Sequence, residues 1–386
     1  MDRNLDRALS QLVEEIEHIE ETRRRFGQVL RTIKQGIDLG RFPALATNVL
    51  ETQLVTRIEP TDLSGLRIAG IDGGLVKRSF RSIDLLLTRG IAVIFEFGPW
   101  EGPRVEFFPG PFPEPQVKPI ASSLSGLELD QLASLERTAT ELRVALAVLE
   151  KFDTDLILMD GSLFYHPRDR PSTGSPVFEK FQEVMALYRQ LYTGAGKRKT
   201  TLVGVVKDSR STRVVNLLGD ILPHLVRSPS VFEMMQGVDY RWLLKISRDC
   251  ELLDTFLEEG ERTFLFSYSS ELVQNSNALV DDLSSWASNI WVTYLRTARD
   301  DLPIRIEVLV ASGNTVQERA ERALRAILPL SWSHSEYGVP TPILEADARA
   351  RISNDETQLI VDRLMALSGL TYASLEKRRS RNPFGG

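Results

Sequence analysis

Residues 68–74 have the sequence Ile-Ala-Gly-Ile-Asp-Gly-Gly, and residues 156–162 repeat the same design as Leu-Ile-Leu-Met-Asp-Gly-Ser. In both stretches an apolar run ends in an aspartate that is followed by glycine. Apolar runs of this length are typical of central strands covered on both faces. An aspartate at the carboxyl end of such a strand points into the crevice where open α/β sheets bind ligands. Because adjacent carboxylates repel each other unless a cation lies between them, Asp72 and Asp160 predict a metal-dependent phosphoryl-transfer site.

An ordinary turn is the alternative explanation for each motif, since aspartate before glycine is common in turns. For one motif alone that explanation would suffice. Two such motifs, each after a strand that is expected to be buried, favour a functional pair.

The composition is that of an acidic chain with room for one large α/β core or two smaller ones. It has 386 residues, of which 42% are hydrophobic, and a formal net charge of −6. The single cysteine, Cys250, excludes an internal disulfide and a zinc site built on several thiolates, and it fits a reducing cytoplasm. With no apolar run of about 20 residues and no N-terminal signal pattern, we expect a cytoplasmic protein without a membrane partner.

Local clusters of basic residues must supply any contact with nucleic acid, because the chain as a whole carries no positive field. Three clusters are present, at Lys77, Arg78 and Arg81, at residues 197–199 and at residues 377–381. Clusters of this size are usually solvated surface. Only the first adjoins a candidate carboxylate, so Lys77, Arg78 and Arg81 are predicted to bind nucleic acid.

The N-terminal segment carries a heptad pattern. Its apolar residues follow steps of four and three, with Arg23 as the one break, at Leu5, Leu9, Leu12, Ile16, Ile19, Phe26, Leu30, Ile33 and Ile37. Such a pattern predicts a helix that pairs with another helix, in a second copy or a partner, or that lies on its own domain. We therefore expect a helical arm over residues 1–56, a catalytic domain over 57–370 and a charged, flexible tail over 371–386.

The order of the expected elements predicts the fold class. Strands are expected at 68–72, 83–97 and 104–108, then an irregular proline-rich segment at 109–119, a helix at 127–152, a strand at 156–160, a helix at 177–192 and a strand at 201–206. Further strands at 262–267 and 304–310 and helices at 316–327, 343–352 and 355–368 follow. Three antiparallel strands followed by α-β-α-β is the order of the ribonuclease-H-like fold, an α/β fold with a mixed sheet.

Nucleases of that fold add acids from helices to those of the strands. In the helix at 127–152 we select Glu141, with Glu136 as the alternative. The late helix offers Asp347, although acids near a helix N-terminus also favour the helix dipole without binding metal. Lys207 follows a strand and is placed to stabilise a scissile phosphate, and Ser209 is placed to contact phosphate oxygens.

Four motifs in this order resemble the NurA nuclease family. They are Ile71–Gly74, Leu158–Leu163, Val205–Ser209 and Pro340–Asp347. Each motif is weak alone, but the ordered set is fairly specific, and the resemblance runs from about Leu66 to Ile352.

The resemblance implies a manganese-dependent deoxyribonuclease, with magnesium as the second ion. It implies a 5′–3′ exonuclease, with endonuclease activity on single-stranded DNA alongside it, that acts as a homodimer with the hexameric HerA ATPase in the resection of DNA ends during repair. Asp72, Glu141, Asp160 and Asp347 would be its metal ligands. Asp347 stands where many members have histidine.

The family's tyrosine is replaced locally by Val339, with Tyr337 as a nearby substitute.

Two other functions stay open on the residues alone. Aspartate-glycine motifs after strands also occur in actin-like ATPases and kinases, where glycines cradle phosphates. A clamp that binds DNA without cutting it is the other alternative.

Overall fold

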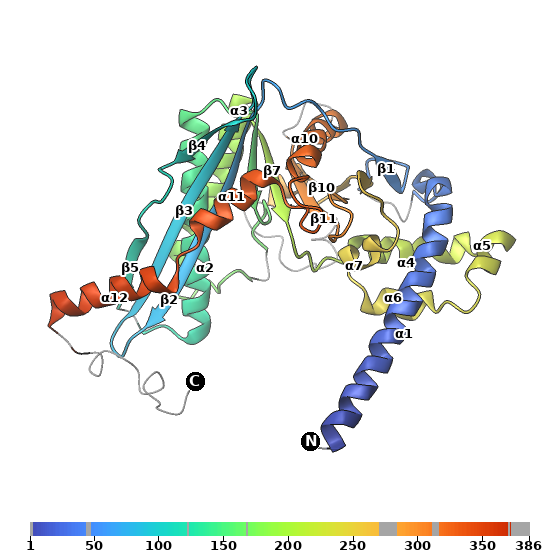
Figure 1. Ribbon diagram of the computed structural model, residues 1–386, viewed down its shortest axis with the longest axis horizontal. Helices are drawn as coiled ribbons and strands as arrows, with labels where there is room; N and C mark the ends of the chain where they lie inside the picture. Colours follow the sequence, from blue (N-terminus) through green and yellow to red (C-terminus); the bar gives the residue numbers. More distant parts are fainter. Residues whose placement is uncertain are drawn as a thin grey trace. The chain divides into compact units, whose positions relative to one another are not determined.

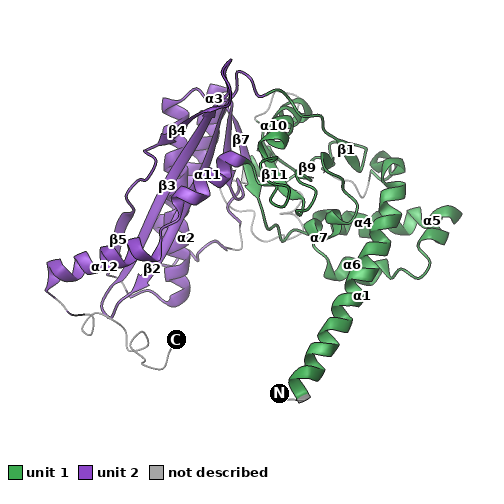
Figure 2. Ribbon diagram, viewed as in Figure 1, with its two compact units in different colours: residues 1–62, 204–277, 284–340 green, residues 63–203, 278–283, 341–386 purple. Residues whose placement is uncertain are grey.

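The structure is a computed structural model that describes residues 3–43, 48–121, 123–166, 169–269, 284–310, 316–369 and 371. The chain folds into two compact units (Figure 2). Unit 1 comprises residues 1–62, 204–277 and 284–340, and unit 2 comprises residues 63–203, 278–283 and 341–386. Apart from residue 371, the expected tail and its basic cluster lie outside the described residues.

Unit 2 is built on a mixed sheet whose centre is a long hairpin. Strand β2 (Arg67–Ser79) pairs with β3 (Asp84–Glu96) in antiparallel register over its whole length. Strands β4 (Arg104–Phe108) and β5 (Gln116–Ile120) pair with successive parts of β3. Strand β6 (Leu156–Asp160) lies parallel to β2, and the first residues of β7 (Thr201–Val206) follow next to β6. This is the predicted order of strands.

Two expectations for this sheet were wrong. The first strand does not end at Asp72 but continues for seven residues to Ser79, because Gly73 and Gly74 pair with β3 like their neighbours. Part of the segment expected to be irregular forms β5. Its Pro119 is accommodated because β5 pairs with β3 alone, so the missing backbone N–H breaks no ladder on its outer side.

Helices cover both faces of this sheet. On one face lies α2 (Gly126–Lys151), whose leucines pack against β3 and β5, and α3 (Phe178–Arg198) packs beside it. The first turn of α2 is fixed by a capping box between Ser125 and Glu128. On the other face α11 (Thr341–Ala350) buries Ala346 and Ala350 against β3. In Figure 1, α11 and α12 (Asn354–Ser368) follow the length of the hairpin.

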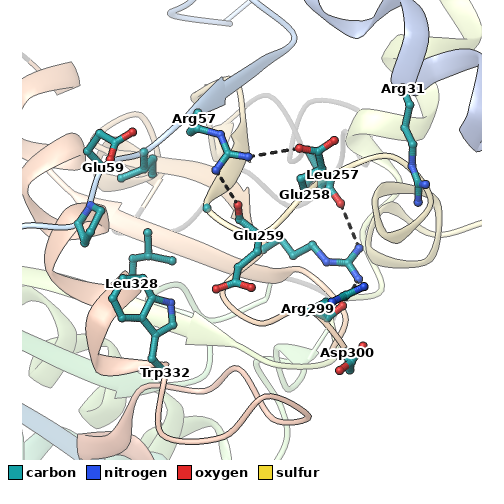
Figure 3. A pocket seen from close by; sticks show the side chains of 14 residues that line it. Arg31, Arg57, Glu59, Leu257, Glu258, Glu259, Arg299, Asp300, Leu328 and Trp332 are labelled. Carbon is teal, nitrogen blue, oxygen red and sulfur yellow. Dashed lines mark hydrogen bonds and ion pairs between the residues drawn. The ribbon is translucent and has the colours of Figure 1, made fainter.

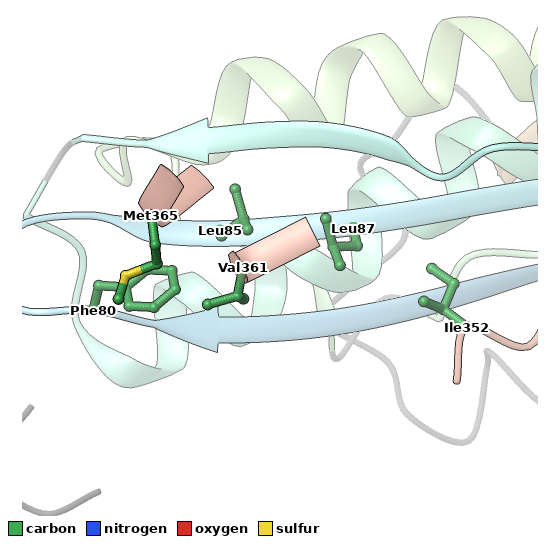
Figure 4. Close-up of a cluster of buried hydrophobic side chains, with 6 residues drawn as sticks. All are labelled: Phe80, Leu85, Leu87, Ile352, Val361 and Met365. Carbon is green, nitrogen blue, oxygen red and sulfur yellow. The ribbon is translucent and has the colours of Figure 1, made fainter. Parts of the chain in front are cut away.

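The far end of the hairpin has a core of its own (Figure 4). Phe80 and Leu85 of the turn region pack with Val361 and Met365 of α12. All four side chains are less than 10% exposed. Burial of this apolar area fixes α12, and through the short connection the end of α11, on the sheet.

Unit 1 contains helices and antiparallel strands. Its helices are α1 (Arg3–Ile33), α4 (Arg213–Leu225), α5 (Pro229–Met234), α6 (Tyr240–Ile246), α7 (Asp249–Asp254), α9 (Ser284–Ala287) and α10 (Val316–Leu330). Its strands are β1 (Val55–Arg57), β8 (Glu261–Thr263), β9 (Phe266–Ser267), β10 (Ile290–Leu295) and β11 (Ile304–Leu309), and short 3₁₀ turns lie at Lys34–Gly36 and Leu39–Arg41. The single strand expected at 262–267 is two strands, which pair with different parts of their neighbours.

Helix α1 confirms the helix expected from the heptads, and its two halves differ. Phe26 and Leu30 are fully buried in unit 1, where α1 contacts α5 and α6. In the first four turns, the apolar residues are half exposed, with Leu9 48% and Leu12 52% accessible. No described helix is both long enough and apolar enough to cross a membrane.

Candidate metal centre

The pairing of two parallel strands brings Asp72 and Asp160 together. In the ladder between β2 and β6, Ile71 lies opposite Met159, and the next residue on each strand is one of the two aspartates. Both side chains therefore leave the sheet at the same level. Although β2 continues past Asp72, β6 ends at Asp160.

Helix α11 adds Asp347 to this pair. The helix can approach because Gly70 and Gly74 flank Asp72, and a side chain at either position would collide with the backbone of Pro342 or Ala350. Such close approach of a helix to a strand requires residues without a Cβ atom. One carboxylate oxygen each of Asp72, Asp160 and Asp347 lies within 4.8 Å of the others. Asp72 is buried and the other two are partly exposed.

Glu141 approaches from the opposite face of the sheet, on α2. Its carboxyl group fills the space that a side chain at position 73 would need: a Cβ atom on Gly73 would lie 2.6 Å from Glu141 Oε1. Gly73, the residue after Asp72 on β2, therefore makes room for this acid. The second glycine-containing motif has a different use, since Gly161 has a φ of +111° and turns the chain away at the end of β6.

The electrostatics of the cluster are unfavourable without a cation. Burial, together with the charges of Asp160 and Asp347, raises the pKa of Asp72 to about 6, against the hydrogen bond that the Gly73 N–H donates. Burial is the main cause that raises the pKa of Glu141 to about 8; Arg137 opposes this rise, and the charges of Asp72 and Asp160 add to it. Buried acids that repel each other are a recurrent signature of functional sites.

Glu136, the alternative to Glu141, is matched by basic residues instead. Its carboxylate pairs with Lys118 of β5 and, at 2.9 Å, with Lys180 of α3. Two lysines neutralise a single buried acid there, so no positive ion is required. The structure therefore places Glu141, and not Glu136, beside the aspartates.

The predicted basic residues of the first cluster lie further along β2. Lys77 is five residues from Asp72, about 17 Å along a strand, and its ammonium group pairs with Asp130 of α2. Arg78 and Arg81 are exposed at the same end of the hairpin. Their role in binding DNA stays a prediction.

Lys207 and Ser209 belong to unit 1. Lys207 follows β7 directly and is partly buried. Ser209 is 8% exposed, and its hydroxyl lies 3.3 Å from that of Tyr294, which donates to Asp249. Ser209 therefore belongs to an interior network, and its contact with phosphate, like that of Lys207, stays a prediction. Tyr337 is 44% exposed in the same unit.

The sequence motifs did not point to Arg137. Its guanidinium Nε lies 3.0 Å from Glu141 Oε1, four residues later on α2. The signal was present in the sequence as a basic residue one helical turn before an acid. Such pairs are common on exposed helices, and only the position of Glu141 at the aspartates makes this one unusual.

Unit 1 contains a cavity of another kind (Figure 3). It has a volume of about 670 Å³. Arg57 lies 3.2 Å from Glu258 and donates to the carbonyl of Glu259. Its basic and acidic residues balance in number, as Arg31, Arg57, Arg296 and Arg299 against Glu59, Glu258, Glu259 and Asp300. A balanced lining attracts neither a metal ion nor a phosphate, so the acidic cluster of unit 2 remains the candidate site.

Comparisons with known proteins bear on the family and the fold. The NurA domain family matches residues 66–352. The NurA nuclease from Sulfolobus solfataricus is a similar solved structure, with a TM-score of 0.54 and 15% identity over 96% of this chain and 99% of that one. A crystal structure of NurA bound to dAMP and manganese has a TM-score of 0.41 and 13% identity, covering 96% and 97% of the two chains.

Among curated proteins no match was found. The matched family region contains Asp72, Asp160 and Asp347 of the cluster and also Glu141. The structural similarity extends over nearly the whole of both chains and confirms the predicted ribonuclease-H-like fold. The chain therefore belongs to the NurA family, as its four motifs predicted.

Proposed function

We propose that this protein is a manganese-dependent DNA nuclease that hydrolyses phosphodiester bonds at Asp72, Glu141, Asp160 and Asp347. The observation that carries this function is the convergence of Asp72, Asp160 and Asp347 from three separate elements. Glu141 of α2 lies against Gly73, the residue next to Asp72. Membership of the NurA family supports the reaction and makes manganese the first ion to test, with magnesium second.

The residues of the cluster fit a divalent cation. Carboxylate oxygens are ligands that Mn²⁺ and Mg²⁺ prefer. Glu141 Oε1 is buried and has no hydrogen-bond partner among the described residues, and its one ion pair, to Arg137, does not have hydrogen-bond geometry. A cation would satisfy this oxygen and remove the repulsion that raises the pKa of Asp72.

In the proposed site, Asp72 would be the central ligand of the metal, and Asp160, Asp347 and Glu141 would be the other ligands. The chemistry that a bound cation supplies is polarisation of the scissile phosphate and acidification of a water molecule. Asp72 and Glu141 must release their protons before they can act as ligands, because a ligand carboxylate is ionised. Lys207 is proposed to stabilise the negative charge that develops on the phosphate.

The direct test is incubation of purified protein with end-labelled linear DNA, with and without Mn²⁺. Shortened products are expected only with the metal, and the position of the lost label gives the polarity. Asp72→Asn protein, purified in parallel, controls for contaminating nucleases. ATP binding without any cleavage would favour the kinase-like alternative, and DNA binding without cleavage would favour the clamp.

The partner that we propose is a HerA-type hexameric ATPase, in the resection of DNA ends for repair. Family membership supports this partner. It also supports the specificity that we expect, which is 5′–3′ exonuclease activity with endonuclease activity on single-stranded DNA. The test is a comparison of cleavage products with and without the ATPase and ATP. We propose a cytoplasmic location, which suits the buried, unpaired Cys250.

Homodimerisation is proposed through the exposed stripe of α1. Leu5, Leu9, Leu12 and Ile16 repeat at steps of four and three and are each about half exposed. Leu9→Glu with Leu12→Glu is expected to shift the protein towards monomer in sedimentation. Leu359→Glu on α12 is the control, because Leu359 is 70% exposed outside any heptad. An unchanged dimer in the α1 variant would place the interface elsewhere.

A further inference from the structure

Arg137 is a basic side chain at the edge of the acidic cluster. It lies on α2 one turn before Glu141, with its Nε atom 3.0 Å from Glu141 Oε1. Its charge also acts on Asp72 across the site. An arginine at this position forms an ion pair with Glu141, one of the carboxylates that are proposed to bind the cation.

The ion pair between Arg137 and Glu141 is incomplete on both sides. Glu141 Oε1 gains no hydrogen bond from it, although that atom is buried. Among the described residues, no other acceptor pairs with the two terminal nitrogens of Arg137, and the side chain is 46% exposed. Arg137 thus keeps its two terminal NH₂ groups for a ligand that arrives from solvent.

The arginine six residues further along α2 makes a useful comparison. Arg143 is also 46% exposed and also pairs with a glutamate, Glu183. Glu183, however, is 44% exposed and has a second partner, since Lys180 lies 3.1 Å away. Arg143 therefore belongs to a surface network, whereas Arg137 faces a buried acid with like-charged neighbours.

We propose that Arg137 is a phosphate-binding residue that leaves Glu141 when a divalent cation binds there and then holds a DNA phosphate at the site. This inference rests on the proposed nuclease function. A cation on Glu141 repels the guanidinium, because like charges at this distance interact strongly in a partly buried site. The released fork of donors matches two phosphate oxygens, a geometry that lysine cannot reproduce.

A purely structural role for Arg137 predicts the opposite effect on metal binding. If Arg137 only held Glu141 in place, its removal would weaken binding of Mn²⁺. If Arg137 competes with the cation for Glu141 and then binds DNA, its removal strengthens binding of Mn²⁺ and lowers kcat/KM for cleavage of DNA. Only a phosphate-binding role therefore predicts that the affinity for Mn²⁺ rises while the efficiency of DNA cleavage falls.

The experiment compares wild type, Arg137→Gln, Arg137→Lys and Arg143→Gln. Calorimetric titration with Mn²⁺ in the absence of DNA gives the metal affinity, and cleavage of labelled DNA at several salt concentrations gives kcat/KM and KM. For Arg137→Gln we expect severalfold tighter Mn²⁺ binding and a kcat/KM lower by roughly tenfold to a hundredfold, the effect of one lost charged hydrogen bond. Arg137→Lys should recover only part of the loss.

The salt dependence identifies the phosphate contact. Loss of one contact should make the slope of log KM against log salt shallower by about 0.7 to 0.9. Arg143→Gln should match wild type in Mn²⁺ affinity, in kcat/KM and in the salt dependence of KM. Weaker Mn²⁺ binding in Arg137→Gln, or unchanged cleavage, would overturn the role of Arg137 while leaving the nuclease in place. Absence of Mn²⁺-dependent cleavage by wild type would instead overturn the proposed function, and this role with it.

Discussion

Glu136 and Glu141 lie five residues apart on α2, and both are buried, but their surroundings differ completely. Around Glu136, Lys118 and Lys180 supply two positive charges to one carboxylate. Around Glu141, two aspartates add negative charge, and one incomplete ion pair opposes them. Five residues on a helix correspond to a rotation of about 140°, so the two side chains meet different neighbours.

The difference separates a structural acid from a functional one. A buried charge that is fully paired contributes to packing and requires nothing further. A buried acid left among other acids destabilises the metal-free protein and is retained where a cation binds. The expected effects of substitutions therefore differ in kind: changes around Glu136 should affect stability, and changes around Glu141 should affect metal binding and cleavage.

The largest effect is expected for Asp72→Asn, which removes the acid shared by the whole cluster. Mn²⁺-dependent cleavage should fall by about a thousandfold or more, and the fold should be retained. Metal-free protein at pH 8 should gain stability of up to about 3 kcal/mol, because the substitution removes an acid whose pKa burial raises to about 6. Labelled-DNA assays and thermal melts measure both effects. Cleavage at the wild-type rate would remove Asp72 from the mechanism.

Exchange of the two glutamates for glutamine tests the comparison directly. Glu141→Gln should lower cleavage by about a hundredfold with no loss of stability, because glutamine resembles the protonated acid. Glu136→Gln should lower the free energy of unfolding by about 2 kcal/mol, since it removes one of the two carboxylates that pair with the partly buried Lys180. Its cleavage at low temperature should stay near wild type. The same phenotype in both variants would contradict the separation.

The pH dependence of metal binding should follow the raised pKa values. The folded protein still holds protons on Asp72 and Glu141 at pH values where the unfolded chain has lost them. The contribution of these two acids to the free energy of unfolding is therefore complete below about pH 4, and it is lost as the pH rises through about 6 and 8. Mn²⁺ must displace these protons, and its affinity should rise by roughly tenfold per pH unit between pH 6 and 8.

Calorimetry in two buffers of different ionisation enthalpy measures this release of protons. Glu141→Gln is the control and should lose the part of the dependence between pH 7 and 8. Binding of Mn²⁺ with the same affinity at pH 6 and pH 8 would show that the two acids are ionised without the metal.

The smallest effect is expected for Gly73→Ala. The new methyl group would lie 2.6 Å from the carboxyl of Glu141 and should displace it. Binding of Mn²⁺ should weaken by about tenfold, and Glu136 should be unaffected. Gly126→Ala, which meets open space at the start of the same helix, is the control. Unchanged Mn²⁺ affinity in Gly73→Ala would mean that Glu141 is not held by this contact.

Local pattern was sufficient where an element is determined by its own residues. The helix at 127–152 and the strand at 156–160 were predicted within a residue or two of α2 and β6, because their apolar periodicity and flanking residues are strong. The end of β2 and the existence of β5 were missed, because glycine and proline weaken a strand signal that pairing with β3 restores.

By itself, the sequence determined the family, the order of strands and helices in unit 2, and the choice of Asp72, Asp160 and Asp347 as candidate acids. The tertiary structure decided which glutamate joins them and brought Arg137 to the site. The physical reason is that the β2–β6 register, the close approach of α11 over Gly70 and Gly74, and the space at Gly73 are contacts between distant segments. Charges converge only when such packing is complete, and no local pattern encodes it.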